Sequence, residues 1–163
     1  MSARPSREYP ERPIVGVGAV IVDAEARRVV LVRRGAPPLQ GRWSLPGGAV
    51  ELGETLRAAT EREALEETGL VVAAEELLDV FDRILPDDDG RLRYHYVLVD
   101  FLCRVRSGAL RAGGDAAEAA WAGENELERF KLEQPAAGVI RKAFATARHK
   151  KTHHGGTETR RRN

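Results

Sequence analysis

The sequence predicts one domain that mixes helices and strands, of the α/β or α+β class, on the strength of three observations. Long apolar runs with strand character occur at residues 14–22 and 91–105. A run of helix-forming residues without Gly or Pro covers 55–68 and stops at Gly69. The chain of 163 residues is long enough for one domain with a core and too short for two ordinary ones.

The composition narrows the class of protein. The net charge is +1, so no overall electrostatic attraction favours nucleic acid or a membrane surface. Cys103 is the single cysteine, which excludes an intramolecular disulfide, and we expect it to be a small core residue. We see neither an apolar run of about 18 residues nor a signal peptide, so a cytoplasmic location is expected.

The first elements are two strands that follow a polar arm. Residues 1–13 contain three prolines and are expected to be a flexible arm. Residues 14–22 (IVGVGAVIV) form a nearly continuous apolar run, as in a buried strand. Residues 28–34 predict a second strand that pairs with the first as a hairpin. A Pro/Gly loop then leads to WSLPGG, whose double glycine permits close approach of another group.

Two long strands are expected after the helix. Residues 73–78 have local helical character, but we favour extended structure over 77–84, because PDDDG at 86–90 is a strong turn signal and a hairpin with 91–105 would follow. Alternation along 91–105 places Tyr96, Leu98, Asp100 and Leu102 on one face. Asp100 either pairs with Arg33 or Arg34 across the sheet or faces the substrate, and we favour the pairing.

The last part of the chain predicts a strand, a short helix and a longer helix. Residues 116–122 are too short for a convincing helix and are expected to form a strand, and residues 124–130 a short helix. Residues 133–148 suit an amphipathic helix with Val139, Ile140 and Phe144 facing inward. The basic tail 149–163 is expected to be flexible, which leaves 14–148 as the folded domain.

Three acids of the first predicted helix need an explanation. Glu63, Glu66 and Glu67 stand at i, i+3 and i+4, so they project from one side within an arc of about 100°. Like charges at this spacing destabilise an isolated helix. One interpretation is a solvated acidic face partly neutralised by Arg57 and Arg62. The other is a site for a hard cation such as Mg²⁺ or Mn²⁺, which prefers oxygen ligands and substrate phosphates.

The surrounding pattern favours the second interpretation. The stretch GAVELGETLRAATEREALEETGL at 48–70 resembles the Nudix box, G-x5-E-x7-R-E-U-x-E-E-x-G-U, where U is a bulky apolar residue. Every fixed position is filled, and only Ala64 is small for its place. The fixed residues are Gly48, Glu54, Arg62, Glu63, Glu66, Glu67, Gly69 and Leu70. The flanking pattern extends the resemblance to about residues 12–145.

The resemblance implies a fold and an activity. The fold is an α+β domain, a Nudix-type α/β/α sandwich with a mixed, curved sheet between helices. The activity is hydrolysis of the pyrophosphate of a nucleoside diphosphate linked to another moiety. Divalent cations, Mg²⁺ or Mn²⁺, supply charge neutralisation and a water of lowered pKa for this chemistry.

The resemblance also assigns roles within the box. Glu63, Glu66 and Glu67 are expected to ligate metal, together with a backbone group of Gly48, and Glu66 and Glu67 count as catalytic. Glu54 and Arg62 are expected to form a mainly structural pair. A general base is often supplied by an acid on a late loop, for which Glu118 ranks ahead of Asp115.

Residues outside the box are candidates for substrate contacts. Arg33, Arg34 and Arg42 can bind phosphate or the linked moiety, since guanidinium groups suit phosphate oxygens. An exposed basic strand end is the alternative for this group. His95 is either a surface residue or a substrate contact.

Several substrates and one other class of function stay open at this point. WSLPGGAVELGET and GGDAAEAAW favour an ADP-ribose-like substrate, and a nucleoside triphosphate or oxidised dNTP is the alternative. A catalytically silent ligand-sensing module would be expected to have lost a box acid, and none is lost. Only the basic tail favours an RNA-processing enzyme. The expected partner is a nucleotide-derived small molecule, and a homodimer is a further expectation from the family.

Overall fold

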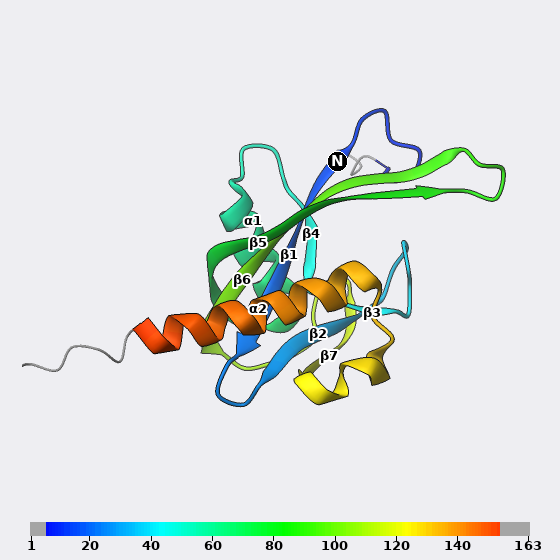
Figure 1. Cartoon of the computed structure of the whole chain (residues 1–163). Coiled ribbons are helices and arrows are strands. Elements are labelled where there is room, and N and C mark those ends of the chain that lie inside the picture. The colour runs from blue at the N-terminus through cyan, green and yellow to red at the C-terminus, as the bar shows by residue number, and fades with distance from the viewer. Residues whose placement is uncertain (1–5, 154–163) are drawn as a thin grey trace, which may run out of the picture.

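A computed structural model describes residues 6–153 of the chain, with side chains through residue 150. The elements are seven strands, two α-helices and one 3-10 helix within this described part (Figure 1). In chain order they are β1 Ile14–Asp23, β2 Arg28–Arg34, β3 Trp43–Ser44, β4 Gly47–Ala49, α1 Leu56–Thr68, β5 Leu70–Pro86, β6 Leu92–Gly108, β7 Ala116–Gly123, η1 Glu124–Phe130 and α2 Gln134–His153.

The strands form a mixed sheet in the order β3-β2-β1-β6-β5, with β4 beside β1 and β7 beside β2. The β1–β6 pair is parallel and the other pairs are antiparallel. One edge of β1 is occupied by β6, so β4 and β2 follow one another along its other edge, at residues 16–18 and 22–23. The predicted β1–β2 hairpin is therefore confirmed, although only its closed end is paired.

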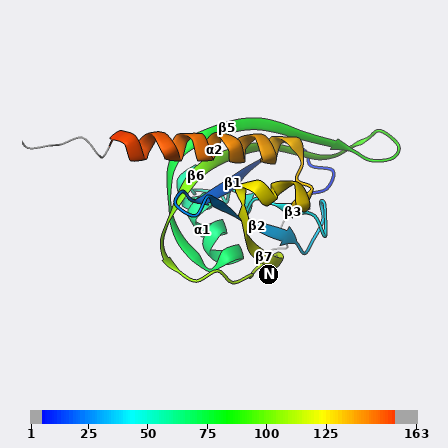
Figure 2. The ribbon, with the colours of Figure 1, turned by 60° about the horizontal axis from the view of Figure 1, so that its bottom comes forward.

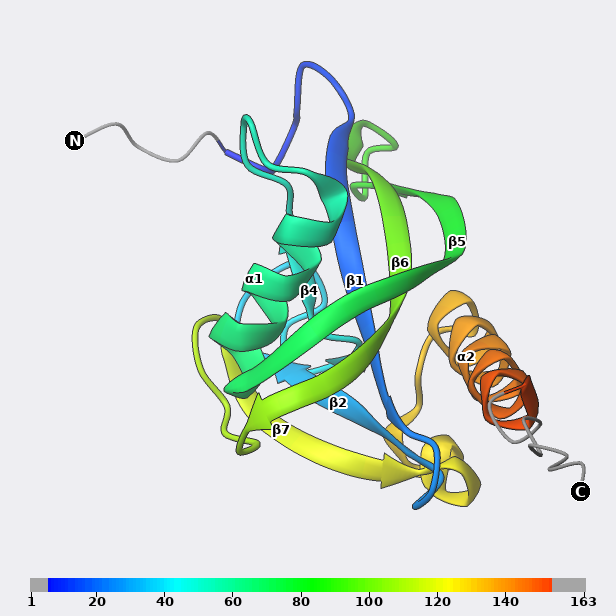
Figure 3. The same cartoon turned by 90° about the vertical axis from the view of Figure 1, so that its left-hand side faces the viewer.

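The two α-helices lie on opposite sides of the central strands (Figure 3). One core, around β1 and β6, includes Ala59 and Ala64 of α1. The other core includes Ile140 and Phe144 of α2, as the sequence predicted. The α+β sandwich with a mixed sheet is thus confirmed, and Figure 2 shows α2 running along the outside of the long, curved β5 and β6.

Three element boundaries differ from the sequence-based expectation. β5 begins at Leu70 because it pairs with β6 along its whole length, which overrides the local helical character of 73–78. The short helix at 124–130 is a 3-10 helix. α2 runs through His153, so it includes the first residues of the predicted tail, while 154–163 lie outside the described residues.

The predicted N-terminal arm contacts the β5–β6 hairpin where the structure describes it. The Glu8 carboxylate accepts hydrogen bonds from Tyr94 Oη at 2.6 Å and Arg93 at 3.0 Å. The Tyr9 hydroxyl donates to Asp87 at 2.9 Å, and its backbone N–H donates to the Arg93 carbonyl at 2.8 Å. Residues 6–13 are therefore attached to the hairpin, and residues 1–5 lie outside the described part of the chain.

Helix α1 is delimited by the residues that the sequence indicated. Thr55 caps its N-terminus by accepting from the Ala58 N–H at 3.1 Å, and Gly69 ends it in the left-handed region at φ 71°. The buried residues of this helix include two glutamates, Glu63 and Glu67. None of the described helices has the combination of length and apolar sequence that crossing a bilayer requires.

Candidate active site

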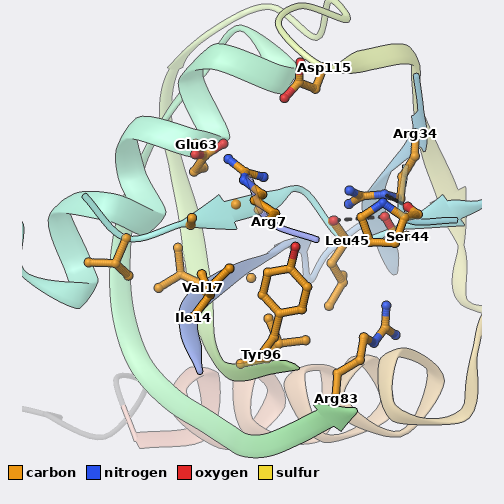
Figure 4. A pocket seen from close by; sticks show the side chains of 18 of the residues that line it. Arg7, Ile14, Val17, Arg34, Ser44, Leu45, Glu63, Arg83, Tyr96 and Asp115 are labelled. Carbon is orange, nitrogen blue, oxygen red and sulfur yellow. Dashed lines mark hydrogen bonds between the residues drawn. The ribbon is translucent and has the colours of Figure 1, made fainter. Parts of the chain in front are cut away.

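A cavity of about 1040 Å³ opens beside the buried face of α1 (Figure 4). Its walls include the N-terminal segment 6–12, the β3–β4 region with the following loop, the acidic face of α1, and one face of β1, β5 and β6. Residues of β2 and the loop after it, the segment 114–116 and Ala136 complete the lining. All three acids of the i, i+3, i+4 set line it. The sheet and α1 thus converge on one volume large enough for a nucleotide-sized ligand.

Glu63 and Glu67 are carboxylates that the fold removes from water. Their exposed fractions are 9% and 7%. Burial raises the pKa of Glu63, although the neighbouring Arg62 opposes the shift. Burial raises the pKa of Glu67 to about 7, although the Gly47 N–H donates to its Oε2 at 3.0 Å. Arg62 and the Gly47 N–H offset only part of the cost of burying these two negative charges. Two such carboxylates in one cavity are a favourable environment for a cation.

The double glycine permits this approach of helix to strand. A Cβ on Gly48 would lie 2.4 Å from Glu63 Oε1, and a Cβ on Gly47 would lie 2.1 Å from the Val17 carbonyl oxygen. Both distances are far below any real carbon–oxygen contact. Strand β4 can therefore lie between β1 and the acids of α1 only because these positions carry no side chain.

Arg62 organises the entrance to α1. It donates from Nε and Nη2 to both oxygens of Glu54, at 2.7 and 2.8 Å, and from Nη1 to Glu63 at 2.8 Å and Glu66 at 3.3 Å. The Arg62 guanidinium lowers the pKa of Glu54 to about 2. The predicted Glu54–Arg62 pair is therefore confirmed, and it closes the loop that carries Gly48 onto the helix.

The donor set fits a hard divalent cation, though it is not assembled as a ready-made cage. No group of three His, Cys, Asp or Glu side chains in the described chain is close enough together to hold an ion unaided. The carboxylates of Glu63, Glu66 and Glu67 and the backbone of Gly48 all line the cavity, and oxygen ligands of this type suit Mg²⁺ or Mn²⁺. A bound substrate phosphate would complete such a coordination shell.

The two candidate general bases lie in different places. Asp115 lines the cavity (Figure 4), and its charge contributes to the raised pKa of Glu67. Glu118 does not line the cavity. Its exposed carboxylate accepts a hydrogen bond from Arg33 Nη1 at 3.0 Å, across the β2–β7 pair. Of the two candidates, Asp115 therefore lies at the cavity and Glu118 lies outside its walls.

Of the candidate substrate-binding residues, one lies at the cavity and three do not. Arg34 lines the cavity, and its Nε donates to the Pro38 carbonyl at 2.7 Å. Arg33, Arg42 and His95 are not among the residues that line it. His95 alternates along β6 with Tyr94 and Tyr96, so its side chain points to the other face of the sheet.

The favoured pairing of Asp100 with Arg33 or Arg34 is wrong. Strand β1 lies between β2 and β6, so residues of β2 are not neighbours of Asp100. The side chains of Arg33 and Arg34 bind Glu118 and the Pro38 carbonyl. Asp100 lines the cavity and is 4% exposed. Asp100 therefore faces the space that a substrate would occupy, which is the other position considered for it from the sequence.

The sequence did not indicate that Arg7 belongs to the site. In Figure 4 its guanidinium lies between Glu63 and Tyr96. Burial raises the pKa of both groups, and the charge of Arg7 opposes this rise. Arg7 sits in a polar, proline-containing segment with no periodicity, so no local signal distinguished it. Tyr96 and Arg83 also line the cavity.

Comparison with known proteins places the chain in a family. The model of the NUDIX domain matches residues 12–143, most of the chain. The chain belongs to the NUDIX family. Nudix hydrolases generally use divalent metal ions such as Mg²⁺ or Mn²⁺.

Individual relatives carry more than one activity name. An ADP-ribose pyrophosphatase of Methanocaldococcus jannaschii is 38% identical over 118 residues, which are 72% of this chain and 66% of that protein. A putative 8-oxo-dGTP diphosphatase of Bacillus subtilis is 34% identical over 112 residues, 68% of each chain. A NUDIX hydrolase structure from Nitrosomonas europaea superposes with a TM-score of 0.70 at 24% identity, covering 83% of this chain and 90% of that one.

Proposed function

We propose that this Nudix domain is a Mg²⁺- or Mn²⁺-dependent pyrophosphatase. It hydrolyses a nucleoside diphosphate linked to another moiety and releases a nucleoside monophosphate and a phosphorylated moiety. The observation that carries the proposal is the placement of the buried carboxylates of Glu63 and Glu67 beside Gly47 and Gly48, inside one large cavity. Burying two acids side by side is unfavourable by itself, and a bound cation removes that cost.

Each part of the site has a role in this chemistry. The carboxylates of Glu63, Glu66 and Glu67 would hold the cation, which when bound neutralises phosphate charge and lowers the pKa of water. Arg34 and Arg7 face the cavity and supply positive charge to phosphate oxygens. Asp115 is the candidate to accept a proton from the attacking water, because it lines the cavity and its charge acts on Glu67.

ADP-ribose, or a similar nucleoside diphosphate derivative, is the favoured substrate. The support is the sequence around WSLPGG and the relative from Methanocaldococcus jannaschii. An oxidised dNTP is the second candidate, and the Bacillus subtilis relative supports it. The cytoplasmic location and a homodimer stay predictions, and so does an RNA substrate, whose support was the basic tail.

The test is a Glu67→Gln variant assayed for release of nucleoside monophosphate with Mg²⁺ and Mn²⁺. We expect turnover to fall at least about a hundredfold, because the variant removes a charge needed to hold the cation. Glu61→Gln is the matched control, since Glu61 lies on the same helix, is exposed, and accepts from the Ala74 N–H, which an amide oxygen can still do. Unchanged turnover in Glu67→Gln contradicts the mechanism. Nucleotide binding without turnover in the wild type would support a ligand-sensing module instead.

A further inference from the structure

The cavity has a floor built from three adjacent strands, and its residues follow the register of the sheet. Gly16 of β1 stands beside Leu98 of β6, which stands beside Phe81 of β5. The next row of this face is Ile14, Tyr96 and Arg83. All six residues line the cavity. Position 16 carries no side chain, and Leu98 covers it, since a Cβ on Gly16 would lie 2.7 Å from Leu98 Cδ2. The middle of the floor is therefore apolar, which suits a flat ring better than a polyhydroxyl group.

Asp100 closes one end of this floor. It pairs in register with Gly18 of β1, and Gly18 pairs with Gly47 of β4, whose N–H donates to Glu67. Neighbouring strands are about 4.8 Å apart, so the backbone of Asp100 lies roughly 10 Å from the metal-binding end of the cavity. A substrate whose phosphates sit at Glu63 and Glu67 would place its base, which lies one ribose beyond the phosphates, within reach of Asp100.

The carboxylate of Asp100 has no bonding partner within the described part of the protein, and its oxygens are open to the cavity. The residue as a whole is 4% exposed, and no side chain or backbone group of residues 6–150 gives it a hydrogen bond or ion pair. No fully buried side-chain oxygen of the described residues lacks a hydrogen-bond partner, so the unpaired oxygens of Asp100 face the cavity that the residue lines. Asp79, opposite on β5, adds a repelling charge. Arg83 is the nearby cation, but its guanidinium pairs with Glu133. Burial, with Asp79, raises the pKa of Asp100 to about 6.

The position of the carboxylate depends on the glycine beside it on β1. A Cβ on Gly18 would lie 2.1 Å from Asp100 Oδ1, which shows that the carboxylate leans over the glycine. A buried acid with a purely structural role normally has hydrogen-bond donors around it. A ligand that brings a donor would supply what the protein does not.

We propose that Asp100 determines the specificity of the site by accepting a hydrogen bond from an amino N–H of a purine base that lies on the Gly16–Leu98–Phe81 floor. The proposal rests on the proposed function, because the phosphates of the substrate must lie at the acids of α1. A base with an amino group satisfies the carboxylate, and a base without one leaves it buried and unpaired. That second situation is the more costly one.

The test compares two ligands that differ by one group: ADP-ribose and its analogue with unsubstituted purine in place of adenine. We expect the wild type to prefer ADP-ribose by about tenfold to a hundredfold in kcat/KM, the range for a hydrogen bond to a charged group. In Asp100→Asn and Asp100→Ala this preference should fall to within about threefold. Two variants are used so that the ratio of kcat/KM for the two ligands can still be measured if one variant folds poorly.

Asp82→Asn is the matched control, because Asp82 lies on the neighbouring strand, is exposed and does not line the cavity. It should keep the preference of the wild type. Dissociation constants of the same two ligands, measured in a Glu67→Gln background, give the ratio independently of turnover. If the proposed function were wrong, hydrolysis would be absent, but the dissociation constants would still show whether the protein prefers one of the two ligands. No preference in the wild type, no binding of either ligand, or a preference that survives in both Asp100 variants would overturn the proposal.

Discussion

Asp100 links the cavity to the stability of the protein, because burial raises the pKa of its carboxyl from 3.8 to about 6. The folded protein then binds this proton more tightly than the unfolded chain does. The contribution of Asp100 to stability is therefore greatest below about pH 4, falls as the pH rises to about 6, and stays lost above that. At about 1.4 kcal/mol per pKa unit, the loss from this single group amounts to roughly 3 kcal/mol at most.

The Asp100→Asn variant separates this effect from those of other acids. We expect its free energy of unfolding, relative to the wild type, to rise by about 1–3 kcal/mol between pH 4.5 and pH 7.5, because the wild type alone pays for the buried charge. Urea denaturation at the two pH values measures the difference. Asp82→Asn, which changes an exposed carboxylate, should follow the wild type. Parallel stability curves for Asp100→Asn and the wild type would contradict a raised pKa.

At the scale of elements, the N-terminal segment and the β5–β6 hairpin form one side of the cavity. The side chains of Glu8 and Tyr9 bind the hairpin through Tyr94, Arg93 and Asp87. These bonds hold Arg7 between Glu63 and Tyr96 (Figure 4). A segment without regular secondary structure thus brings a cation to the site, because its neighbours in the chain are attached to two strands.

Arg7→Ala should raise KM by about threefold to thirtyfold and change kcat less, because the guanidinium contributes mainly to binding of the phosphates. Steady-state kinetics with the favoured substrate measures both values. Arg106→Ala removes the same charge from an exposed position at the far end of β6 and should leave KM unchanged. A fall in kcat at constant KM would assign Arg7 a different role.

At the scale of the whole molecule, the sequence predicts what depends on local pattern and leaves out what depends on strand order. The acids of α1, its stop at Gly69 and the inward residues of α2 follow from spacing, and the structure agrees. The partner of Asp100 does not follow from spacing, because it depends on β1 lying between β2 and β6. The ranking of Glu118 ahead of Asp115 rests on position along the chain, which contains no information about the ion pair of Glu118 with Arg33.

The arrangement of the whole fold also predicts how metal binding affects stability. Helix α1 and strand β4 meet at the cavity acids, the two glycines and Arg62, so a cation held there would join the two elements in the folded state. Mn²⁺ at about a hundred times its dissociation constant should stabilise the protein by about 2.7 kcal/mol, which raises Tm by several degrees. Thermal unfolding followed by circular dichroism, with and without Mn²⁺, measures this shift. The double variant Glu63→Gln and Glu67→Gln should lose the shift, and Glu61→Gln should keep it. An equal shift in the double variant would mean that the ion binds somewhere other than at these carboxylates.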